Sequence, residues 1–311
     1  MNFSPSYIEL YEQGKLQERA KDLIDGLKDC HLCPRACGVN RLKGELGYCK
    51  TGRHAIVSSA NPHFGEEPPL VGRHGSGTIF FTNCNLGCIY CQNYEISWLG
   101  EGREIDKEGL AELMLELQGI GCHNINFVTP THVVAQIVEA VVVAIEKGLR
   151  VPLVYNTGGY DSVDTLRLLK DIFDIYMPDT KYSESEPATK YSNAPNYWKI
   201  NKVCLLEMQK QVGDLRVNEQ GIAERGLLIR HLVLPYNLAG SFEVLKFIHE
   251  HISKDAYVNI MDQYRPCFKA FDFPMLSRSI THDEYKKVVD YAKKLGLHRG
   301  FEEPRRWLIF R

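Results

Sequence analysis

Three closely spaced cysteines are the residues of this chain best suited to chemistry. Cys84, Cys88 and Cys91 stand at C-x3-C-x2-C spacing after the apolar run 78–81, which is typical of a strand. A loop of this spacing can wrap one corner of a cubane and place three thiolates on three irons of a [4Fe-4S] cluster, leaving the fourth iron open to a small molecule. The alternatives are three structural thiols or a zinc knuckle, although zinc normally takes four ligands in a closed site.

A second group of cysteines precedes the first. Cys30, Cys33, Cys37 and Cys49 supply four soft ligands, enough for a closed tetrahedral zinc site or for a second Fe–S cluster. The sequence does not choose between these metals, and reduced thiols in a loop-rich module are the remaining alternative. Such a module has little room for a hydrophobic core, so a bound metal would supply stability. We expect a structural or electron-relay role for it.

Composition narrows the class of protein. A chain of 311 residues suffices for one large domain or two medium ones. Its 37 basic and 39 acidic side chains indicate neither a nucleic-acid nor a membrane partner. Ten cysteines behind a polar amino terminus without a signal peptide argue against a disulfide framework, so we expect a cytoplasmic protein. The apolar stretch 133–145 carries Gln136 and Glu139, which favours a buried helix over a membrane span.

Strand and helix patterns alternate along most of the chain. Strands are expected at 77–82, 124–129, 151–156, 174–178, 227–234 and 256–261, and helices at 106–118, 132–147, 162–172, 196–212, 241–252 and 281–296. Upstream, Ser4 and Pro5 suit a helix start, with serine as the cap, and an amphipathic helix follows Gly14. Alternation of this kind implies right-handed crossovers and a parallel sheet.

The predicted fold is therefore α/β, a partial (β/α)6 TIM-like barrel open on one side, with a small N-terminal cysteine-rich module. We expect residues 1–64 to form a helix and that module, 65–275 the barrel, and 276–311 a C-terminal helix and tail packed on it. The Gly- and Pro-punctuated stretch 51–77 predicts a connecting loop. The polar stretch 182–195 predicts a surface loop that could act as a lid.

Polar residues recur where the expected strands end. They are Thr129, Thr131 and His132 after the second strand, Asn156 and Gly158 after the third, Asp179 and Lys181 after the fourth, Arg230 in the fifth, and Cys267 beyond the sixth. Working residues of parallel barrels collect at this end, so we expect a site there. His132 can cap a helix or face the pocket. Arg230, if buried, needs an internal acid or a ligand carboxylate. Cys267 is either an inert thiol or a hydrogen-atom donor to a substrate radical.

With Tyr90 beside its third cysteine, the Cys84–Cys91 loop resembles that of the radical S-adenosylmethionine (radical SAM) enzymes. Across about residues 65–265 the chain resembles the branch related to the pyruvate formate-lyase activating enzyme, and the N-terminal cysteines resemble an extension in one homologue group. This resemblance implies that the open iron chelates S-adenosylmethionine, whose reductive cleavage gives a 5′-deoxyadenosyl radical. It also implies cofactor contacts from Tyr90, Asn156, Gly158, Asp179 and Lys181, with Lys181 meeting the cofactor carboxylate. The branch's glycine-glycine-glutamate, which binds the cofactor amino group, is absent; Thr129, Thr131 and His132 stand in its place, and Thr129 joins the cofactor-binding candidates.

Three functions are compatible with this pattern. The first is an activase-like radical SAM enzyme that acts on a protein such as a glycyl radical enzyme. The second modifies a small molecule or cofactor precursor, and either would take electrons from a donor such as flavodoxin or ferredoxin. The third is a cluster- or metal-carrying module without turnover, which the recurrent polar residues at the strand ends disfavour. The sequence does not identify the substrate.

Overall fold

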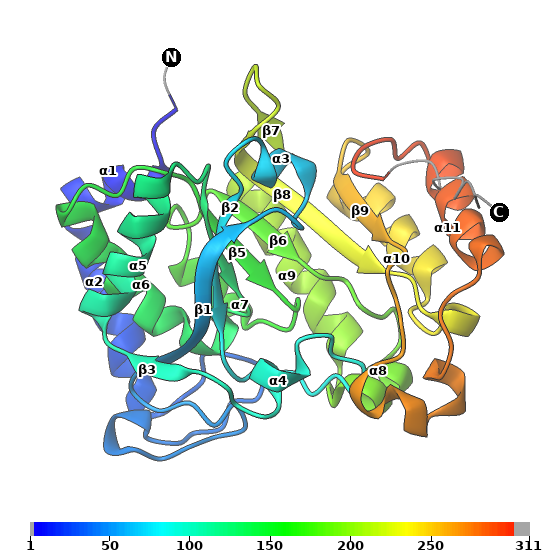
Figure 1. Ribbon diagram of the computed structural model, residues 1–311, viewed down its shortest axis with the longest axis horizontal. Helices are drawn as coiled ribbons and strands as arrows, with labels where there is room; N and C mark the ends of the chain where they lie inside the picture. Colours follow the sequence, from blue (N-terminus) through cyan, green and yellow to red (C-terminus); the bar gives the residue numbers. More distant parts are fainter. Residues whose placement is uncertain (1–2, 302–311) are drawn as a thin grey trace.

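The computed structural model describes residues 3–301 and is built on one curved sheet (Figure 1). Six of its strands are parallel neighbours: β2 (Ser76–Phe81), β4 (Ile125–Val128), β5 (Leu153–Thr157), β6 (Ile175–Pro178), β8 (Ala223–Leu232) and β9 (Tyr257–Met261). These are the six strands expected from the sequence, and they are neighbours in the order of the chain. The predicted α/β fold with an open partial barrel is confirmed.

Helices cover the outer face of this sheet. The long ones that follow strands are α5 (Lys107–Ile120), α6 (Val134–Glu146), α9 (Tyr197–Val212) and α11 (His282–Leu295), and the short ones are α7 (Val163–Leu168) and α10 (Ser241–Phe247). All six expected helices are present, although α7 ends earlier than predicted and α10 continues as the π-helical turn Ile248–Ile252. Short 3-10 turns lie at Gly26–Lys28, Arg41–Lys43, Thr131–Val133, Pro235–Asn237, Phe268–Asp272 and Pro274–Leu276.

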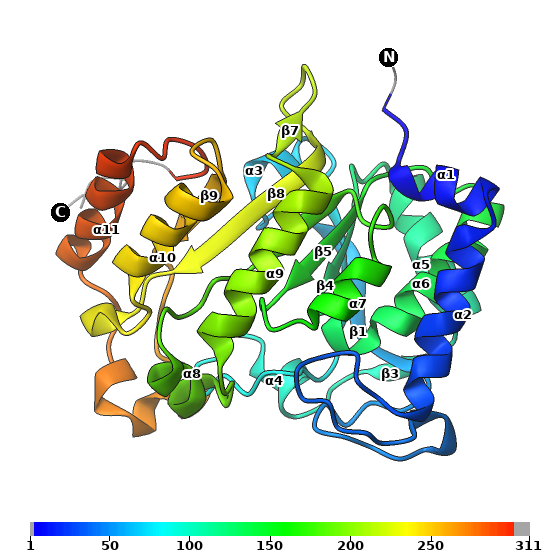
Figure 2. The same ribbon diagram turned by 180° about the vertical axis from the view of Figure 1, so that it is seen from behind.

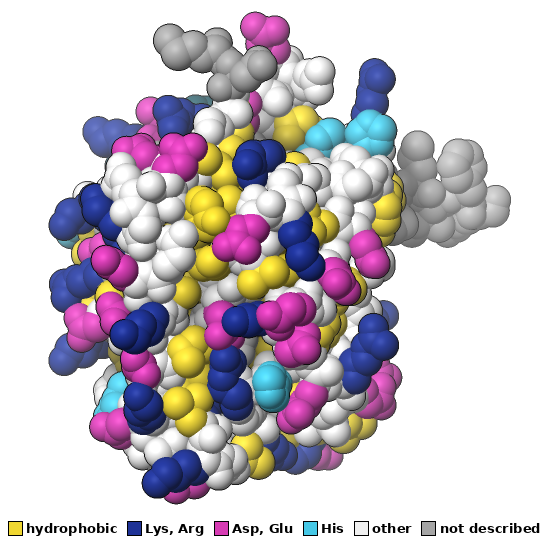
Figure 3. All heavy atoms as spheres, turned by 90° about the vertical axis from the view of Figure 1, so that its left-hand side faces the viewer, with side chains coloured by type: hydrophobic (Ala, Val, Ile, Leu, Met, Phe, Trp, Pro, Cys, Tyr) yellow, Lys and Arg dark blue, Asp and Glu magenta, His cyan; other side chains and the backbone are white. Residues whose placement is uncertain are grey.

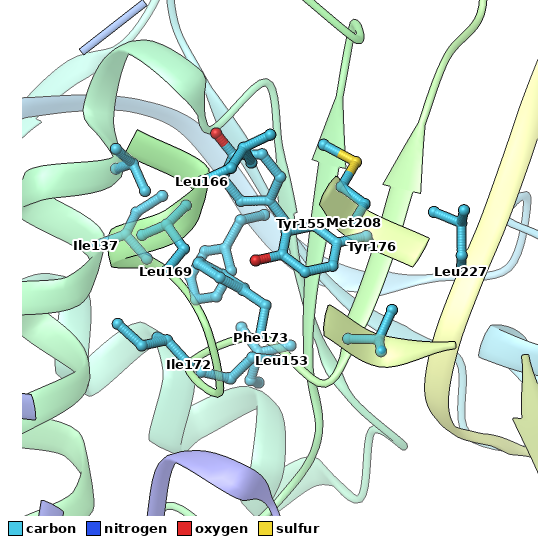
Figure 4. Close-up of a cluster of buried hydrophobic side chains, with 14 of the residues drawn as sticks. Ile137, Leu153, Tyr155, Leu166, Leu169, Ile172, Phe173, Tyr176, Met208 and Leu227 are labelled. Atoms are coloured by element: carbon cyan, nitrogen blue, oxygen red, sulfur yellow. The ribbon is translucent and has the colours of Figure 1, made fainter. Parts of the chain in front are cut away.

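The main core lies between sheet and helices. Figure 4 shows Tyr155 of β5 and Tyr176 of β6 packed with Phe173 and with Leu166 of α7. The ring centroids of Tyr155 and Phe173 are 4.9 Å apart in an edge-to-face arrangement. The apolar stretch 133–145 forms α6 and is largely buried, as expected. Among residues 3–301, no helix is long and apolar enough to cross a membrane.

The amino-terminal helices join this same core. α1 (Ser6–Glu12) and α2 (Lys15–Asp25) contribute Tyr7, Leu16 and Leu23 to it, and α2 packs on α6. The expected cap by Ser4 is wrong, because α1 begins after Pro5 and has no side-chain cap. Ser6, the first residue of the helix, donates from its backbone N–H and its hydroxyl to the buried carboxylate of Asp174. On the face that carries these helices, basic and acidic side chains are interspersed (Figure 3).

The predicted loop at 51–77 is wrong, because the segment contains strand β1 (Ala55–His63) and the short helix α3 (Pro68–Val71). β1 pairs antiparallel with β2, and β3 (Arg103–Ile105) pairs with its first three residues. Pro62 obscured this strand in the sequence. It lies beyond the stretch paired with β3, where proline is tolerated at a sheet edge.

The predicted surface loop at 182–195 is also wrong. Residues Ser185–Ser192 form α8, whose Ala188, Tyr191 and Ser192 are buried. The carbonyl oxygens of Tyr191 and Ser192 accept hydrogen bonds from the backbone N–H groups of Ile89 and Gly87 at 2.9 and 2.8 Å. The segment is therefore anchored on the cysteine loop.

The remaining short elements are α4 (Tyr94–Ser97) and β7 (Arg216–Val217). Figure 2 shows α4, α8 and the dark-blue N-terminal loops together at the end of the sheet to which the parallel strands point. The C-terminal helix α11 packs against α10. Residues 1–2 and the expected tail from residue 302 onward lie outside the described residues.

Candidate functional site

A cavity of about 250 Å³ opens at the carboxyl ends of the parallel strands. It is lined by Cys84, Cys88, Tyr90 and Cys91 from the loop after β2, and by Thr129, Asn156, Gly158, Asp179, Lys181 and Arg230 from the next strands. The structure thus brings the three cysteines of the predicted cluster loop and all six predicted cofactor-binding residues onto one cavity. Thr131, His132 and Cys267 do not line it.

The three thiols of the cysteine loop each accept one hydrogen bond. Leu86 N donates to Cys84 Sγ at 3.3 Å, Ser192 Oγ to Cys88 Sγ at 3.0 Å, and Ser97 Oγ to Cys91 Sγ at 3.1 Å. Donors of this kind suit thiolates that carry negative charge. Burial raises the pKa of all three thiols, and the nearby ammonium of Lys181 partly opposes this effect. Thiolates here consequently need a positively charged partner, which an iron–sulfur cluster would provide.

The number and spacing of the thiols fit a [4Fe-4S] cluster. Three cysteines can bind three different irons of a cubane, and the fourth iron then keeps an open position. Among residues 3–301, no three His, Cys, Asp or Glu side chains surround one point at this or any other site. The donor set and the cavity beside it fit a [4Fe-4S] group.

Asp179 is the centre of the charged wall of the cavity. Lys181 Nζ lies 2.5 Å from its Oδ2, and Arg230 Nε donates to its Oδ1 at 2.8 Å. Burial alone would raise the pKa of Asp179, but Arg230 and Lys181 lower it below its usual value. Burial opposes the charge on Lys181 as well, yet Asp179 and Cys88 raise its pKa above the usual range. Both side chains are therefore charged, and Lys181 has its ammonium beside the cysteine loop.

Arg230 connects this wall to the interior of the barrel. Its Nη2 donates to Asn156 Oδ1 at 2.8 Å, and its Nη1 lies 3.8 Å from Glu66 Oε2. Glu66 follows β1 and is mostly buried, and burial raises its pKa although Arg230 opposes this. Sequence reasoning found Arg230 and its need for an acid but missed Glu66. No spacing signal marks a glutamate inside a Gly- and Pro-rich stretch.

Thr129 has an unusual backbone conformation for its type. Its φ is 61°, a left-handed value that is rare for a β-branched residue. The backbone N–H of Thr129 donates to Asn156 O at 2.9 Å, which holds the ends of β4 and β5 together. Strain of this kind occurs at ligand sites, where the surrounding structure maintains it.

Thr131 and His132, which follow Thr129 closely in the sequence, make hydrogen bonds within the protein interior. Thr131 Oγ1 donates to the buried Asp161 Oδ1 at 2.8 Å, and Asp161 also accepts from Thr157. His132 donates from Nε2 to Thr82 O at 2.9 Å, and burial lowers its pKa to about 4, so it is neutral. Neither is positioned to contact a ligand in the main cavity.

The glycines after β5 serve close packing of the protein itself. A Cβ on Gly158 would lie 2.6 Å from Leu86 Cδ1, and one on Gly159, where φ is 73°, would lie 2.1 Å from Asp179 O. A side chain at either position would push the cysteine loop or the end of β6 away. Cys267 donates from Sγ to Tyr90 O at 3.2 Å and so fastens the loop after β9 to the cysteine loop.

The four N-terminal cysteines face one another across a much smaller space. Cys30, Cys33, Cys37 and Cys49 all line a cavity of about 10 Å³, which Arg41 and His132 also border. A space of this size is at the lower limit for holding one water molecule. Burial raises the pKa of Cys33 to about 12, and the other three thiols contribute to the rise. Within residues 3–301, these sulfurs do not surround one point as the ligands of a single ion would.

Comparison with known proteins identifies the class. The sequence model described as the Radical SAM superfamily matches residues 78–200, which span the cysteine loop and the strand ends up to β6. The uncharacterized protein MJ0674 of Methanocaldococcus jannaschii is 31% identical over 305 residues, which is 95% of this chain and 83% of that protein. The chain therefore belongs to the radical SAM superfamily. Membership implies a [4Fe-4S] cluster and S-adenosylmethionine as cofactors.

Other relatives are more distant. The uncharacterized protein MJ0808 of the same organism is 23% identical over 309 residues, 89% of this chain and 84% of that protein. A radical SAM methyltransferase from Sphaerobacter thermophilus has a TM-score of 0.48 at 14% identity, covering 73% of this chain and 67% of its own. HydG, a maturase of the [FeFe]-hydrogenase, has a TM-score of 0.48 at 13% identity, covering 73% of this chain and 52% of its own.

Proposed function

We propose that Cys84, Cys88 and Cys91 hold the [4Fe-4S] cluster and that the enzyme abstracts a hydrogen atom from a substrate at the cavity mouth. The observation that carries this proposal is the convergence of three hydrogen-bonded thiols and the Asp179–Lys181–Arg230 group on one cavity. When bound, the cluster supplies the electron that cleaves S-adenosylmethionine to a 5′-deoxyadenosyl radical. An electron donor such as flavodoxin or ferredoxin would reduce it.

The side chains of the cavity orient the cofactor. Lys181 presents an ammonium that can pair with its carboxylate, while Arg230 keeps Asp179 paired. Thr129 is the candidate to face the amino group of the cofactor, because it lines the cavity and its backbone has a strained left-handed conformation. Tyr90 and Asn156 shape the walls, and Gly158 lets Leu86 close one side.

We infer that the substrate is a protein segment, as for an activase that acts on a glycyl radical enzyme. The segment 182–195, expected as a lid, contributes no residue to the lining of the cavity, and α8 is anchored on the cysteine loop. A volume of about 250 Å³ is small for a pocket that must also enclose a second molecule. A polypeptide that reaches in from the open mouth meets this limit better than a sequestered metabolite.

We also propose that Cys30, Cys33, Cys37 and Cys49 bind a separate metal centre with a structural role. Support comes from their shared cavity and from its size, which favours one zinc ion over a second Fe–S cluster. Buried thiols with raised pKa values gain most from a metal that takes them as thiolates.

Anaerobic reconstitution followed by a cleavage assay tests the main proposal. Protein reconstituted with iron and sulfide, reduced with dithionite and mixed with S-adenosylmethionine is expected to release 5′-deoxyadenosine. Failure to release it in protein that carries the cluster would reduce the chain to a cluster-carrying module.

The substrate class is tested by deuterium transfer. Extract from cells grown in heavy water is separated by size into a protein fraction and a small-molecule fraction, and each is added to the assay. We expect the protein fraction to place deuterium in 5′-deoxyadenosine. Transfer from the small-molecule fraction alone would contradict a protein substrate.

A further inference from the structure

Three buried hydroxyl groups form a chain that ends at one thiol of the cysteine loop. Tyr90 Oη lies 2.6 Å from Tyr182 Oη, Tyr182 Oη lies 2.8 Å from Ser192 Oγ, and Ser192 Oγ donates to Cys88 Sγ at 3.0 Å. Tyr182 and Ser192 are 0% exposed and Tyr90 is 6% exposed. The chain of hydroxyls begins and ends on the cysteine loop itself, and its middle comes from α8 and from the segment between β6 and α8.

The direction of these hydrogen bonds follows from proton counting. Each hydroxyl has one proton to donate. Ser192 donates its proton to Cys88 Sγ, so in the next hydrogen bond Tyr182 must be the donor and Ser192 the acceptor. Tyr182 has then used its own proton, so Tyr90 must donate to Tyr182. All three O–H dipoles therefore point toward the sulfur. Hydrogen bonds in such a series polarise one another, and the last one is strengthened.

The surrounding structure fixes the chain and keeps it protonated. Ser192 is held by its own carbonyl oxygen, which accepts from Gly87 N at 2.8 Å. The ring of Tyr90 packs edge-to-face against Tyr264 at 5.8 Å between centroids. Both phenol groups are buried, and a tyrosine hydroxyl is protonated at physiological pH, so both remain donors.

The other two thiols have simpler environments. Cys84 accepts from the backbone N–H of Leu86, and Cys91 accepts from the hydroxyl of Ser97. A buried chain of hydroxyls is costly to order and gains nothing for packing over phenylalanine and alanine of similar shape. Because the chain of hydroxyls ends at a sulfur, it indicates an effect on the electron density of that sulfur and so on the group that the sulfur binds.

We propose that the Tyr90–Tyr182–Ser192 chain raises the reduction potential of the cluster held through Cys88. This inference rests on the proposed function, because it requires the cluster at the cysteine loop. One-electron reduction adds negative charge that is shared with the cysteine sulfurs, and donors aimed at a sulfur stabilise the reduced form more than the oxidised form. The three residues are positioning residues, which act through Cys88 without contact with the substrate.

A redox titration of the reconstituted protein tests the inference. The cluster is poised with dithionite and mediator dyes, and its reduced fraction is followed by electron paramagnetic resonance in wild type and in Ser192→Ala, Tyr182→Phe and Tyr90→Phe. In Ser192→Ala the equilibrium is expected to move about tenfold toward the oxidised form, a lowering of about 59 mV for one electron. Tyr182→Phe keeps the last hydrogen bond and should shift less, and Tyr90→Phe should shift least.

Tyr264→Phe is the matched control. Its hydroxyl donates to Leu276 O at 2.7 Å and lies outside the chain, although its ring contacts Tyr90. The control should keep the wild-type potential. Should Ser192→Ala fail to fold, the two Tyr→Phe variants, which preserve volume, still rank the effect.

The outcomes separate this inference from the proposed function. Equal potentials in wild type, Tyr182→Phe and Tyr90→Phe, or a rise in any chain variant, would overturn the role of the chain while leaving the cluster assignment intact. Wild-type protein without a reducible cluster would overturn the proposed function, and this inference with it.

Discussion

Arg35 donates a hydrogen bond from Nε to the carbonyl oxygen of Asn85, at 2.9 Å and across 50 residues of sequence. Its guanidinium carbon lies 3.7 Å from the centroid of the Tyr48 ring, and it also donates to the carbonyl oxygen of Asn193 beyond α8. One side chain of the N-terminal cysteine-rich segment thus holds both the cysteine loop and the segment that supports it. The stability of the two cysteine groups should therefore be coupled.

Arg35→Met tests this coupling. A hydrogen bond from a charged donor contributes roughly 1.5–3 kcal/mol, and the contact with Tyr48 adds roughly 0.5–1 kcal/mol. We expect the reconstituted variant to lose its cluster to a chelator at least about ten times faster, since about 1.4 kcal/mol already corresponds to a tenfold change. The loss is measured as bleaching of the visible absorbance. Arg167→Met removes an exposed arginine of α7 and should behave as wild type. Equal rates in all three proteins would show that Arg35 does not support the loop.

The parts of the fold and of the site that could be predicted are those marked by a pattern of neighbouring residues in the sequence. The six parallel strands are apolar runs with helical patterns between them, and the spacing of Cys84, Cys88 and Cys91 is by itself enough to identify the cysteine loop. The carboxyl ends of parallel strands must meet at one edge, so Asn156, Asp179 and Lys181 could be expected on one cavity.

The parts that escaped prediction depend on long-range contacts. Ser192 looks like any serine in a polar stretch, and only the packing of α8 brings it to Cys88, 104 residues away. Glu66 likewise could not be recognised from the sequence, because its role depends on the proximity of Arg230. His132 is polar at a strand end, which suggested a pocket residue, yet its ring points to Thr82 O. Local sequence reports propensity and spacing, and it does not report which distant elements pack together.

The cysteine loop gives the most direct prediction. Cys84→Ala, Cys88→Ala or Cys91→Ala should each abolish the catalytic cluster and all release of 5′-deoxyadenosine, because three thiolates are the minimum for a cubane with one open iron. Cys122→Ala, which removes a buried thiol that donates to His74 O, is the control and should retain both. Full cleavage activity in any one variant of the cysteine loop would contradict the assignment of that residue.

The N-terminal cysteines can be tested without the catalytic cluster. Protein that lacks Cys84, Cys88 and Cys91, purified without oxygen, should still contain about one metal ion per chain by elemental analysis, with zinc expected from the small cavity. Adding Cys33→Ala should remove that metal, because one ligand of a closed four-cysteine site is then missing. Folded protein with neither zinc nor iron would show that the four residues are ordinary thiols.

Buried His231 predicts a pH dependence of stability. It donates from Nδ1 to Thr180 O at 2.6 Å and accepts from Ser241 Oγ at 2.8 Å, and burial lowers its pKa to about 4. The unfolded chain, with a histidine pKa near the ordinary value of about 6.5, binds the proton first. Stability from this residue is therefore present above pH about 6.5 and is lost as the pH falls toward 4, by about 2 kcal/mol at pH about 5.

Urea unfolding at neutral and acid pH measures this effect. In His231→Gln, the difference in unfolding free energy between pH about 7 and pH about 5 should shrink by about 2 kcal/mol. His282→Gln replaces an exposed histidine of α11 and should keep the wild-type difference. An unchanged difference in His231→Gln would mean that this histidine does not contribute to acid sensitivity.

Lys181 carries the last prediction, on the orientation of the cofactor. The open iron can chelate the amino group and one carboxylate oxygen of S-adenosylmethionine, which leaves the other oxygen unpaired in a partly closed site, where an unpaired charge is costly. Lys181 lies beside the cysteine loop, its ammonium already positioned by Asp179, and burial does not remove its charge. A charge-assisted contact of this kind is worth roughly 1.5–3 kcal/mol. Lys181→Met keeps most of the length and removes the charge, so cofactor affinity should fall by roughly one to two orders of magnitude.

The cluster itself should survive in Lys181→Met, since no thiol is altered and Arg230 still pairs with Asp179 at 2.8 Å. Titrating S-adenosylmethionine into the reduced protein and following the electron paramagnetic resonance signal measures the affinity directly. Lys190→Met, at an exposed lysine of α8, controls for the loss of one positive charge. A binding curve for Lys181→Met that matches wild type would remove Lys181 from the cofactor site. Arg230 would then be the cation that faces the cofactor carboxylate, because it also pairs with Asp179 and lines the same wall of the cavity.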